Sequence, residues 1–144
     1  PDGAAPAFVI RALRDPDGAN LDRVQVIKGW LDAEGETQEK VYDIAVSGDR
    51  SIGKDGRCKD AVGNTVNVEK ASFTNAIGDP LFLAYWKDPD FDPKLHAFYY
   101  VRAIEIPTPT WVAKDIVFYG IKAPEDATLV HQERGYTSPV WYTP

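Results

Sequence analysis

Three aspartates at alternating positions are the chain's clearest candidate for metal chemistry. Asp88, Asp90 and Asp92 match the opening spacing of a calcium-binding loop, in which carboxylates supply the hard oxygen ligands that Ca²⁺ prefers. An EF-hand loop also needs glycine at its sixth position and glutamate at its twelfth, and these are Pro93 and Tyr99 here. We interpret the run as a proline-stiffened acidic turn, with a looser calcium site as the alternative. The same interpretation applies to a second turn, formed by Asp15, Asp17 and Asn20.

The residue types that most often carry catalysis lack the neighbours that catalysis needs. Metal-assisted hydrolysis requires several converging ligands, and the two histidines, His96 and His131, belong to no His-x-His pattern. Cys58 is the single cysteine, so an intrachain disulfide is excluded, and no histidine stands near it in the sequence. None of Ser47, Ser51, Ser72 and Ser138 has the flanking signature of a nucleophile. We therefore predict no catalytic, cofactor-binding or metal-binding residue in this chain.

Aromatic residues make up 12% of the chain and allow two interpretations. Buried, they would fill the core between two packed sheets or an interface with another domain. Exposed on a sheet face, the same rings could stack on the apolar faces of sugars. We expect core or interface packing, with carbohydrate binding as the alternative. The residues that decide between these interpretations are Trp30, Trp86, Trp111 and Trp141.

The apolar rhythm that must position these side chains has a period of two residues, which is typical of strands. Phe98–Ile106 gives the strongest strand signal because it is dense in aromatic and β-branched residues. Within it, we expect a tyrosine hydroxyl at Tyr99 or Tyr100 to cap a backbone group at a corner of the sheets. The other expected strands are Ala7–Leu13, Leu21–Asp32, Val41–Val46, Val66–Ala76, Leu81–Trp86, Asp115–Ile121, Thr128–Arg134 and Thr137–Tyr142.

Turn residues separate these strands, and only one stretch resembles a helix. In Asp79–Lys87, the Asp79-Pro80 pair is typical of a helix start, so this segment is left open between helix and strand. Ser47–Thr65 has no periodicity and is expected to be a long surface loop or an exposed hairpin. The pattern predicts an all-β fold, an immunoglobulin-like antiparallel β-sandwich of about seven to nine strands with at most one short helix.

Composition narrows the classes of partner. With 144 residues, the chain fits one domain, residues 1–144. Its net charge of -6 repels phosphate backbones, so we expect no nucleic acid partner. No apolar run reaches the roughly 20 residues of a membrane helix, so we expect no membrane insertion.

The ends of the chain suggest that it belongs to something longer. The sequence has no methionine and starts at Pro1, so we expect a fragment of a larger translation product. The apolar terminal run Val140–Tyr142 is expected to join a sheet or to pack on the absent portion. An isolated fragment with such a surface would tend to self-associate.

Several stretches carry a resemblance to a known family. Phe8–Gln25 continues into Val26–Asp32 and Glu39–Asp43; Ala97–Arg102 is followed by Glu105–Pro109; and the chain closes with Gln132–Pro144. Together these resemble the C-terminal portion of the bacterial domain-of-unknown-function family 3604. The resemblance covers nearly the whole chain, apart from Gly53–Ala61.

The resemblance implies a role as part of a larger protein. Full-length members look like metal-dependent hydrolases related to the polymerase-and-histidinol-phosphatase superfamily, with a His-x-His metal motif in the N-terminal part. The resemblance also implies export, so we expect a periplasmic or secreted parent. No family metal ligand maps onto this chain. We therefore expect a non-catalytic accessory domain whose partner is the N-terminal catalytic domain of the same polypeptide, with a free-standing carbohydrate or ligand-binding module as the alternative.

Overall fold

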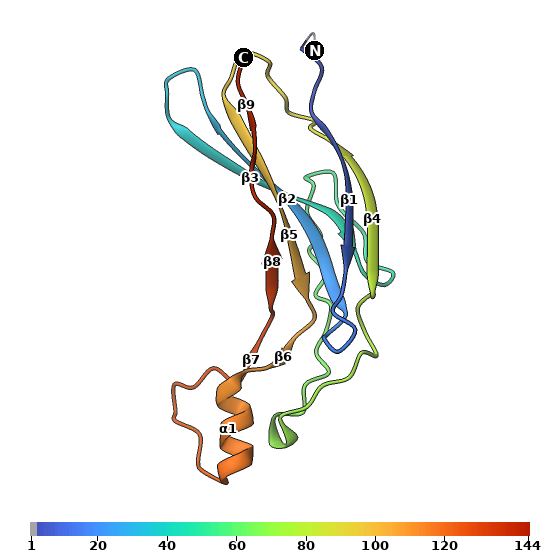
Figure 1. Ribbon diagram of the computed structural model, residues 1–144, viewed down its shortest axis with the longest axis vertical. Helices are drawn as coiled ribbons and strands as arrows, with labels where there is room; N and C mark the ends of the chain where they lie inside the picture. The colour runs from blue at the N-terminus through green and yellow to red at the C-terminus, as the bar shows by residue number, and fades with distance from the viewer. Residues whose placement is uncertain (1–2) are drawn as a thin grey trace.

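A long central strand, β2 (Leu21–Leu31), organises the main sheet of the computed structural model, which describes residues 3–144. It pairs antiparallel with β3 (Thr37–Val46) on one side and with β5 (Ala97–Glu105) on the other. Two short strands, β8 (Arg134–Tyr136) and β9 (Val140–Tyr142), pair in turn with different parts of β5. The result is a five-stranded antiparallel sheet that forms most of the elongated molecule (Figure 1).

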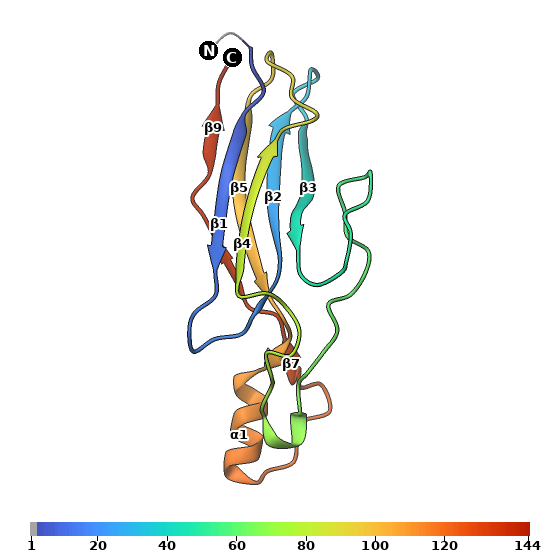
Figure 2. The same cartoon turned by 90° about the vertical axis from the view of Figure 1, so that its right-hand side faces the viewer.

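A second, two-stranded sheet lies across one face of the main sheet (Figure 2). Its strands β1 (Ala7–Leu13) and β4 (Leu81–Lys87) pair antiparallel over their whole length. Alternate side chains of both strands point into the space between the sheets, as the two-residue period of a strand requires. The buried core consists of Ile10, Leu21, Val24, Val26, Phe82, Ala97 and Tyr99.

The expected all-β sandwich is confirmed. Nine strands, all paired antiparallel, and one short α-helix lie within residues 3–144, in agreement with the expected seven to nine strands and single helix. The finer expectation of an immunoglobulin-like topology stays a prediction. The strands expected at Ala7–Leu13, Leu21–Asp32 and Phe98–Ile106 appear as β1, β2 and β5.

The end of the molecule away from the termini carries the helical part (Figure 1). There β6 (Thr108–Pro109) pairs with β7 (Val130–His131), and the helix α1 (Trp111–Tyr119) follows β6 directly. Thr110 caps the helix N-terminus because its side chain accepts a hydrogen bond from the Ala113 amide. Gly120 ends the helix with a φ of 63°, a left-handed conformation that favours glycine.

Two expected strands are wrong. The strand expected at Asp115–Ile121 is the second half of α1, because the caps on both sides of that apolar segment override its strand-like composition. The strand expected at Val66–Ala76 is a short 3-10 turn, η1 (Val68–Lys70), closed by the side chain of Asn67. In contrast, the strand expected at Leu81–Trp86 is confirmed as β4, so the stretch Asp79–Lys87, which the sequence leaves open between helix and strand, is a strand.

Ser47–Thr65 forms the expected long loop and contains no strand. It leaves the end of β3 and runs beside the main sheet before the chain reaches η1 (Figure 2). Within residues 3–144, no helix is both long and apolar enough to cross a lipid bilayer.

Candidate functional site

The acidic turn after β4 holds a buried ion pair. Asp88 Oδ2 lies 2.7 Å from Lys28 Nζ, and both side chains are almost fully buried. The same carboxylate oxygen accepts a hydrogen bond of 2.7 Å from the Tyr99 hydroxyl. The expected bond from this tyrosine to a backbone group is therefore wrong for Tyr99, whose hydroxyl donates to a side-chain carboxylate. Burial is the main cause of the raised Tyr99 pKa, and the Asp88 hydrogen bond adds to it.

Asp90 continues this network towards the surface. Its carboxylate accepts a hydrogen bond of 2.6 Å from the Tyr42 hydroxyl and pairs with Lys40, while its backbone carbonyl accepts one from Lys28 Nζ at 2.8 Å. The hydrogen bond from Lys40 is the main cause of a lowered Asp90 pKa, and the bond from Tyr42 lowers that pKa further.

The aspartates singled out as calcium ligands have other roles. Asp88 and Asp90 are engaged by lysine and tyrosine donors, while Asp92 accepts the Lys94 amide within an exposed turn. Asp15 accepts the Asp17 amide, and the Asn20 side chain donates to carbonyls of the loop around residues 75–78. Across residues 3–144, no three His, Cys, Asp or Glu side chains converge in a way that could hold a metal ion.

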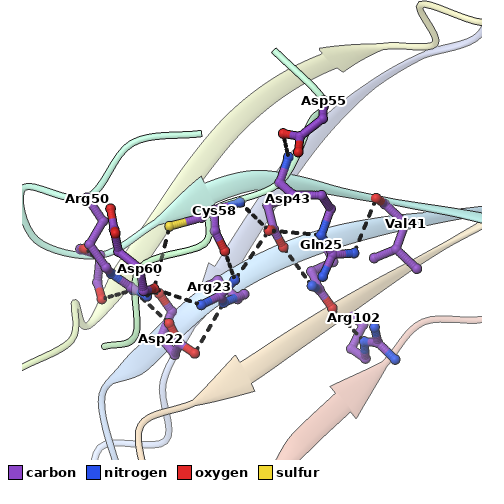
Figure 3. Close-up of polar contacts among 12 residues, drawn as sticks. Asp22, Arg23, Gln25, Val41, Asp43, Arg50, Asp55, Cys58, Asp60 and Arg102 are labelled. Atoms are coloured by element: carbon purple, nitrogen blue, oxygen red, sulfur yellow. Dashed lines mark hydrogen bonds and ion pairs between the residues drawn. The ribbon is translucent and has the colours of Figure 1, made fainter. Parts of the chain in front are cut away.

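A second polar network holds the long loop against β2 and β3 (Figure 3). Asp43 is fully buried and accepts hydrogen bonds from Gln25 at 2.6 Å, from Arg23 at 3.2 Å and from the Cys58 amide at 2.7 Å. Gln25 in turn accepts a hydrogen bond of 2.7 Å from Arg102 of β5. One buried carboxylate thus joins three strands and the loop.

Asp22 anchors the start of the same loop. Its Oδ2 accepts hydrogen bonds from Arg23 at 3.2 Å and Gln132 at 3.0 Å. Its Oδ1 lies 2.6 Å from Arg50 Nη2 in an ion pair. That nitrogen donates instead to the Asp22 carbonyl and to Ser47 Oγ, so Oδ1 accepts no hydrogen bond. The attraction at this oxygen is therefore Coulombic.

Cys58 is a buried free thiol inside this network. Its sulfur lies 3.7 Å from the Asp60 carbonyl oxygen, and its amide is bonded to Asp43. His96 is exposed and directly precedes β5, and His131 lies 3.0 Å from Glu133. These positions are those expected for structural or surface residues.

The outer face of the main sheet, opposite the β1–β4 sheet, carries an aromatic groove. Its floor is the Phe98 ring, which lies over Gly29 on the neighbouring strand. A Cβ on Gly29 would come within 2.3 Å of Phe98 Cζ, so only glycine leaves room for the ring. Trp141 of β9 pairs with Phe98 and stands beside it, with ring centroids 5.2 Å apart.

Further aromatic rings extend this surface along β5. Tyr100 is nearly parallel to Phe98, with an interplanar angle of 9° and centroids 6.4 Å apart. Tyr136 of β8 follows at 6.2 Å from Tyr100. We call Phe98, Tyr100, Tyr136 and Trp141 the aromatic row.

The groove at the Trp141 end of the row has a volume of about 770 Å³. Thr37 and Glu39 of β3 form the rim opposite Trp141, and His96, which directly precedes β5, also lines the groove. Trp141 is 71% exposed, so its ring is available to a ligand. The volume falls within the usual range of small-molecule sites, roughly 300–1,000 Å³.

The outer face of the β1–β4 sheet is a second apolar surface. Val9, Leu83 and Tyr85 have exposed fractions of 76%, 72% and 70%, and Leu13 and Leu81 are also exposed. We call these five residues the β1–β4 patch. Exposed apolar surfaces of this kind are typical of interaction sites.

Helix α1 is also poorly covered. Ala113 is its one buried residue, while Trp111, Phe118 and Tyr119 are exposed. Lys114 lies over the Trp111 ring at 4.4 Å from its centroid. The aromatic content of the chain is thus divided: Trp30 and Trp86 pack against the core, whereas Trp111 and Trp141 face solvent.

The sequence named the tryptophans but missed the groove. Besides Trp141, the groove is formed mainly by Gly29 and Phe98, and these two residues are neighbours only because of the pairing register of β2 and β5. A glycine inside an otherwise apolar strand was the available signal, because it often marks a close approach of another group. The buried networks were missed for the same reason: Lys28 and Asp88 lie far apart in the sequence.

Comparison with known proteins gives a family and no function. The family model described as "Protein of unknown function (DUF3604)" matches residues 1–144, including Gly53–Ala61, which the sequence resemblance did not cover. No curated protein and no solved structure matches the chain. Because the family model covers the whole sequence, this all-β sandwich with its two exposed apolar surfaces belongs to the DUF3604 family.

Proposed function

We propose that this chain is a non-catalytic accessory domain that docks, through the β1–β4 patch, onto a neighbouring domain of a longer protein. The observation that carries the proposal is that β1 and β4 are apolar on both faces. Ile10 and Phe82 of these strands fill the core, while Val9 and Leu83 point away from it. Strands that are apolar on both faces are typical of sheets covered on both sides.

The charged residues on the same face as the patch indicate which charges its partner should carry. Arg11 and Lys87 lie on the same outer face and are exposed, and within residues 3–144 neither forms an ion pair. Arg11 lies within the patch, opposite Leu83, and Lys87 lies at its end. In a chain of net charge -6, these local cations favour a partner whose apolar surface also carries carboxylates. Such a surface on an adjacent domain would cover the patch; without it, a second copy of the chain would compete for the same face.

The resemblance described above supplies the nature of the neighbour. It implies an N-terminal hydrolase-like domain that binds metal, in an exported bacterial parent. The accessory role is supported by the ion pairs that the buried carboxylates form within the chain. Asp43 and Asp88 are paired with the chain's own cations and hold the sheets and the loop together. Their role in this chain is structural.

A double substitution in the β1–β4 patch tests the proposal. Leu83→Lys with Tyr85→Lys should lower the unfolding temperature of the longer protein by about 4 °C or more, because a covered apolar contact is lost. In the isolated 144-residue chain, the same exposed positions should tolerate the change with little effect.

Asp49→Lys is the matched control, since Asp49 is exposed in the loop after β3 and away from the patch. It should leave both proteins unchanged. Equal effects of the double substitution in the longer protein and in the isolated chain would overturn the docking proposal.

A further inference from the structure

We propose that the groove between Trp141 and Glu39 binds a neutral saccharide. The groove and the β1–β4 patch lie on opposite faces of the sandwich, so this inference stands apart from the docking proposal. It rests on a stacking surface, a hydrogen-bonding rim and the size of the space between them.

The stacking surface is built into the sheet. Phe98 lies over Gly29 because that residue has no side chain, and the Tyr100 ring is nearly parallel to the Phe98 ring, at an angle of 9° with centroids 6.4 Å apart. Trp141 is tilted by 49° from Phe98 and forms a wall of the groove. A sugar ring has an apolar face of C–H groups that packs against such rings, whose own faces carry partial negative charge.

The rim supplies the groups that hydroxyls require. Glu39 pairs with Gly29, which pairs with Phe98, which pairs with Trp141. Glu39 therefore lies on the outer face, across the sheet from Trp141. Its carboxylate accepts hydrogen bonds, and Thr37 and His96 add groups that both donate and accept. A ligand with an apolar face and a hydroxyl edge satisfies the floor and the rim together.

The charges select a neutral ligand over an acidic one. Glu39 lines the groove, and the chain as a whole has a net charge of -6. An acidic sugar would therefore meet repulsion both at the site and at a distance. The volume of about 770 Å³ suits a few sugar units and is small for a folded protein partner.

Affinity electrophoresis of the 144-residue chain tests this inference. Native gels would contain hydroxyethylcellulose, galactomannan or polygalacturonate, the last being the acidic polymer. We expect at least one of the two neutral polymers to retard the chain and polygalacturonate not to. Trp141→Ala should weaken the retardation at least about tenfold, as is usual for loss of a central aromatic contact.

Two variants keep the test specific. Trp111→Ala removes a tryptophan that is 74% exposed on α1, outside the groove, and should bind as the unsubstituted chain does. Glu39→Ala removes a rim acceptor and leaves the aromatic floor, so its binding should also fall. Unfolding midpoints measured for each variant would show that the fold is retained.

Three results would overturn the inference: no retardation by either neutral polymer, retardation unchanged in both Trp141→Ala and Glu39→Ala, or stronger retardation by polygalacturonate. Leu83→Lys, on the opposite face, should leave saccharide binding unchanged. The saccharide inference and the docking proposal can therefore fail separately.

Discussion

The Phe98 ring lies over Gly29 so closely that a Cβ at Gly29 would come within 2.3 Å of Phe98 Cζ and 2.4 Å of Cε1. The two residues are paired across the central strands β2 and β5, close to the end of the main sheet where β5 begins. The contact fixes the floor of the aromatic groove and makes the glycine a structural requirement. The two buried polar networks, around Asp88 and around Asp43, likewise depend on particular side chains.

Gly29→Ala should destabilise the fold by about 1–3 kcal/mol, because the new methyl group must displace the Phe98 ring. Denaturant unfolding monitored by tryptophan fluorescence would measure the loss. Gly135→Ala is the matched control: it lies on β8 of the same sheet, and a Cβ there meets nothing within 4 Å. Equal effects of the two substitutions would contradict the packing argument.

Asp88→Asn should cost about 3–5 kcal/mol, because it leaves the buried Lys28 ammonium without its counter-ion. It also weakens the acceptor of the Tyr99 hydroxyl. Thermal and chemical unfolding would give the difference from the unsubstituted chain. Asp92→Asn, in the exposed part of the same turn, should cost no more than about 1 kcal/mol. A comparable loss at both positions would show that turn geometry, and not the ion pair, is what matters.

Asp43→Ala should release the loop that covers Cys58. Asp43 accepts the Cys58 amide and the Arg23 guanidinium, so its removal leaves buried donors unpaired. The Cys58 thiol should then react with a thiol reagent at least about tenfold faster, through more frequent local opening. Asp55→Ala, an exposed change in the same loop, should have a much smaller effect. An unchanged rate in Asp43→Ala would mean that other contacts hold the loop.

Asp90 should make a small, pH-dependent contribution to stability. Lys40 lowers its pKa in the folded state, so ionised Asp90 stabilises the fold above its ordinary pKa. That contribution is lost as the pH falls through the lowered value. Both side chains are nearly half exposed, so we expect no more than about 1 kcal/mol, and less at high salt.

Comparing Asp90→Asn with the unsubstituted chain between about pH 6 and about pH 2 isolates this contribution. The difference in unfolding free energy should be largest at the upper end and vanish in acid. A difference that stays constant across the range would show that the carboxylate's charge is not responsible.

The sequence predicts the central strands because their signal is local. β2 and β5 are rich in β-branched and aromatic residues, and no capping residue competes with that pattern. In α1 the apolar composition resembles a strand, and only Thr110 and Gly120 at its ends mark it as a helix. Before β4, Pro80 is typical of the first turn of a helix, yet the segment that follows it forms a strand because it pairs with β1 along its whole length.

The candidate sites depend on information that a single sequence does not contain. Trp141, Phe98 and Gly29 form one groove only once the strand order and register are known. The β1–β4 patch likewise follows from which face of each strand meets the main sheet. Alternation predicts that two faces exist, but not which of two apolar faces is left exposed.

Thiol labelling at the β1–β4 patch tests the docking proposal most directly. Cys58 is buried and should react slowly, so Leu83→Cys would introduce a thiol that labels selectively. We predict that it reacts at least about tenfold more slowly in the longer protein than in the 144-residue chain, because a neighbouring domain covers it. Asp49→Cys, in the exposed loop, should react equally in both. Equal reactivity of Leu83→Cys in the two proteins would contradict the account.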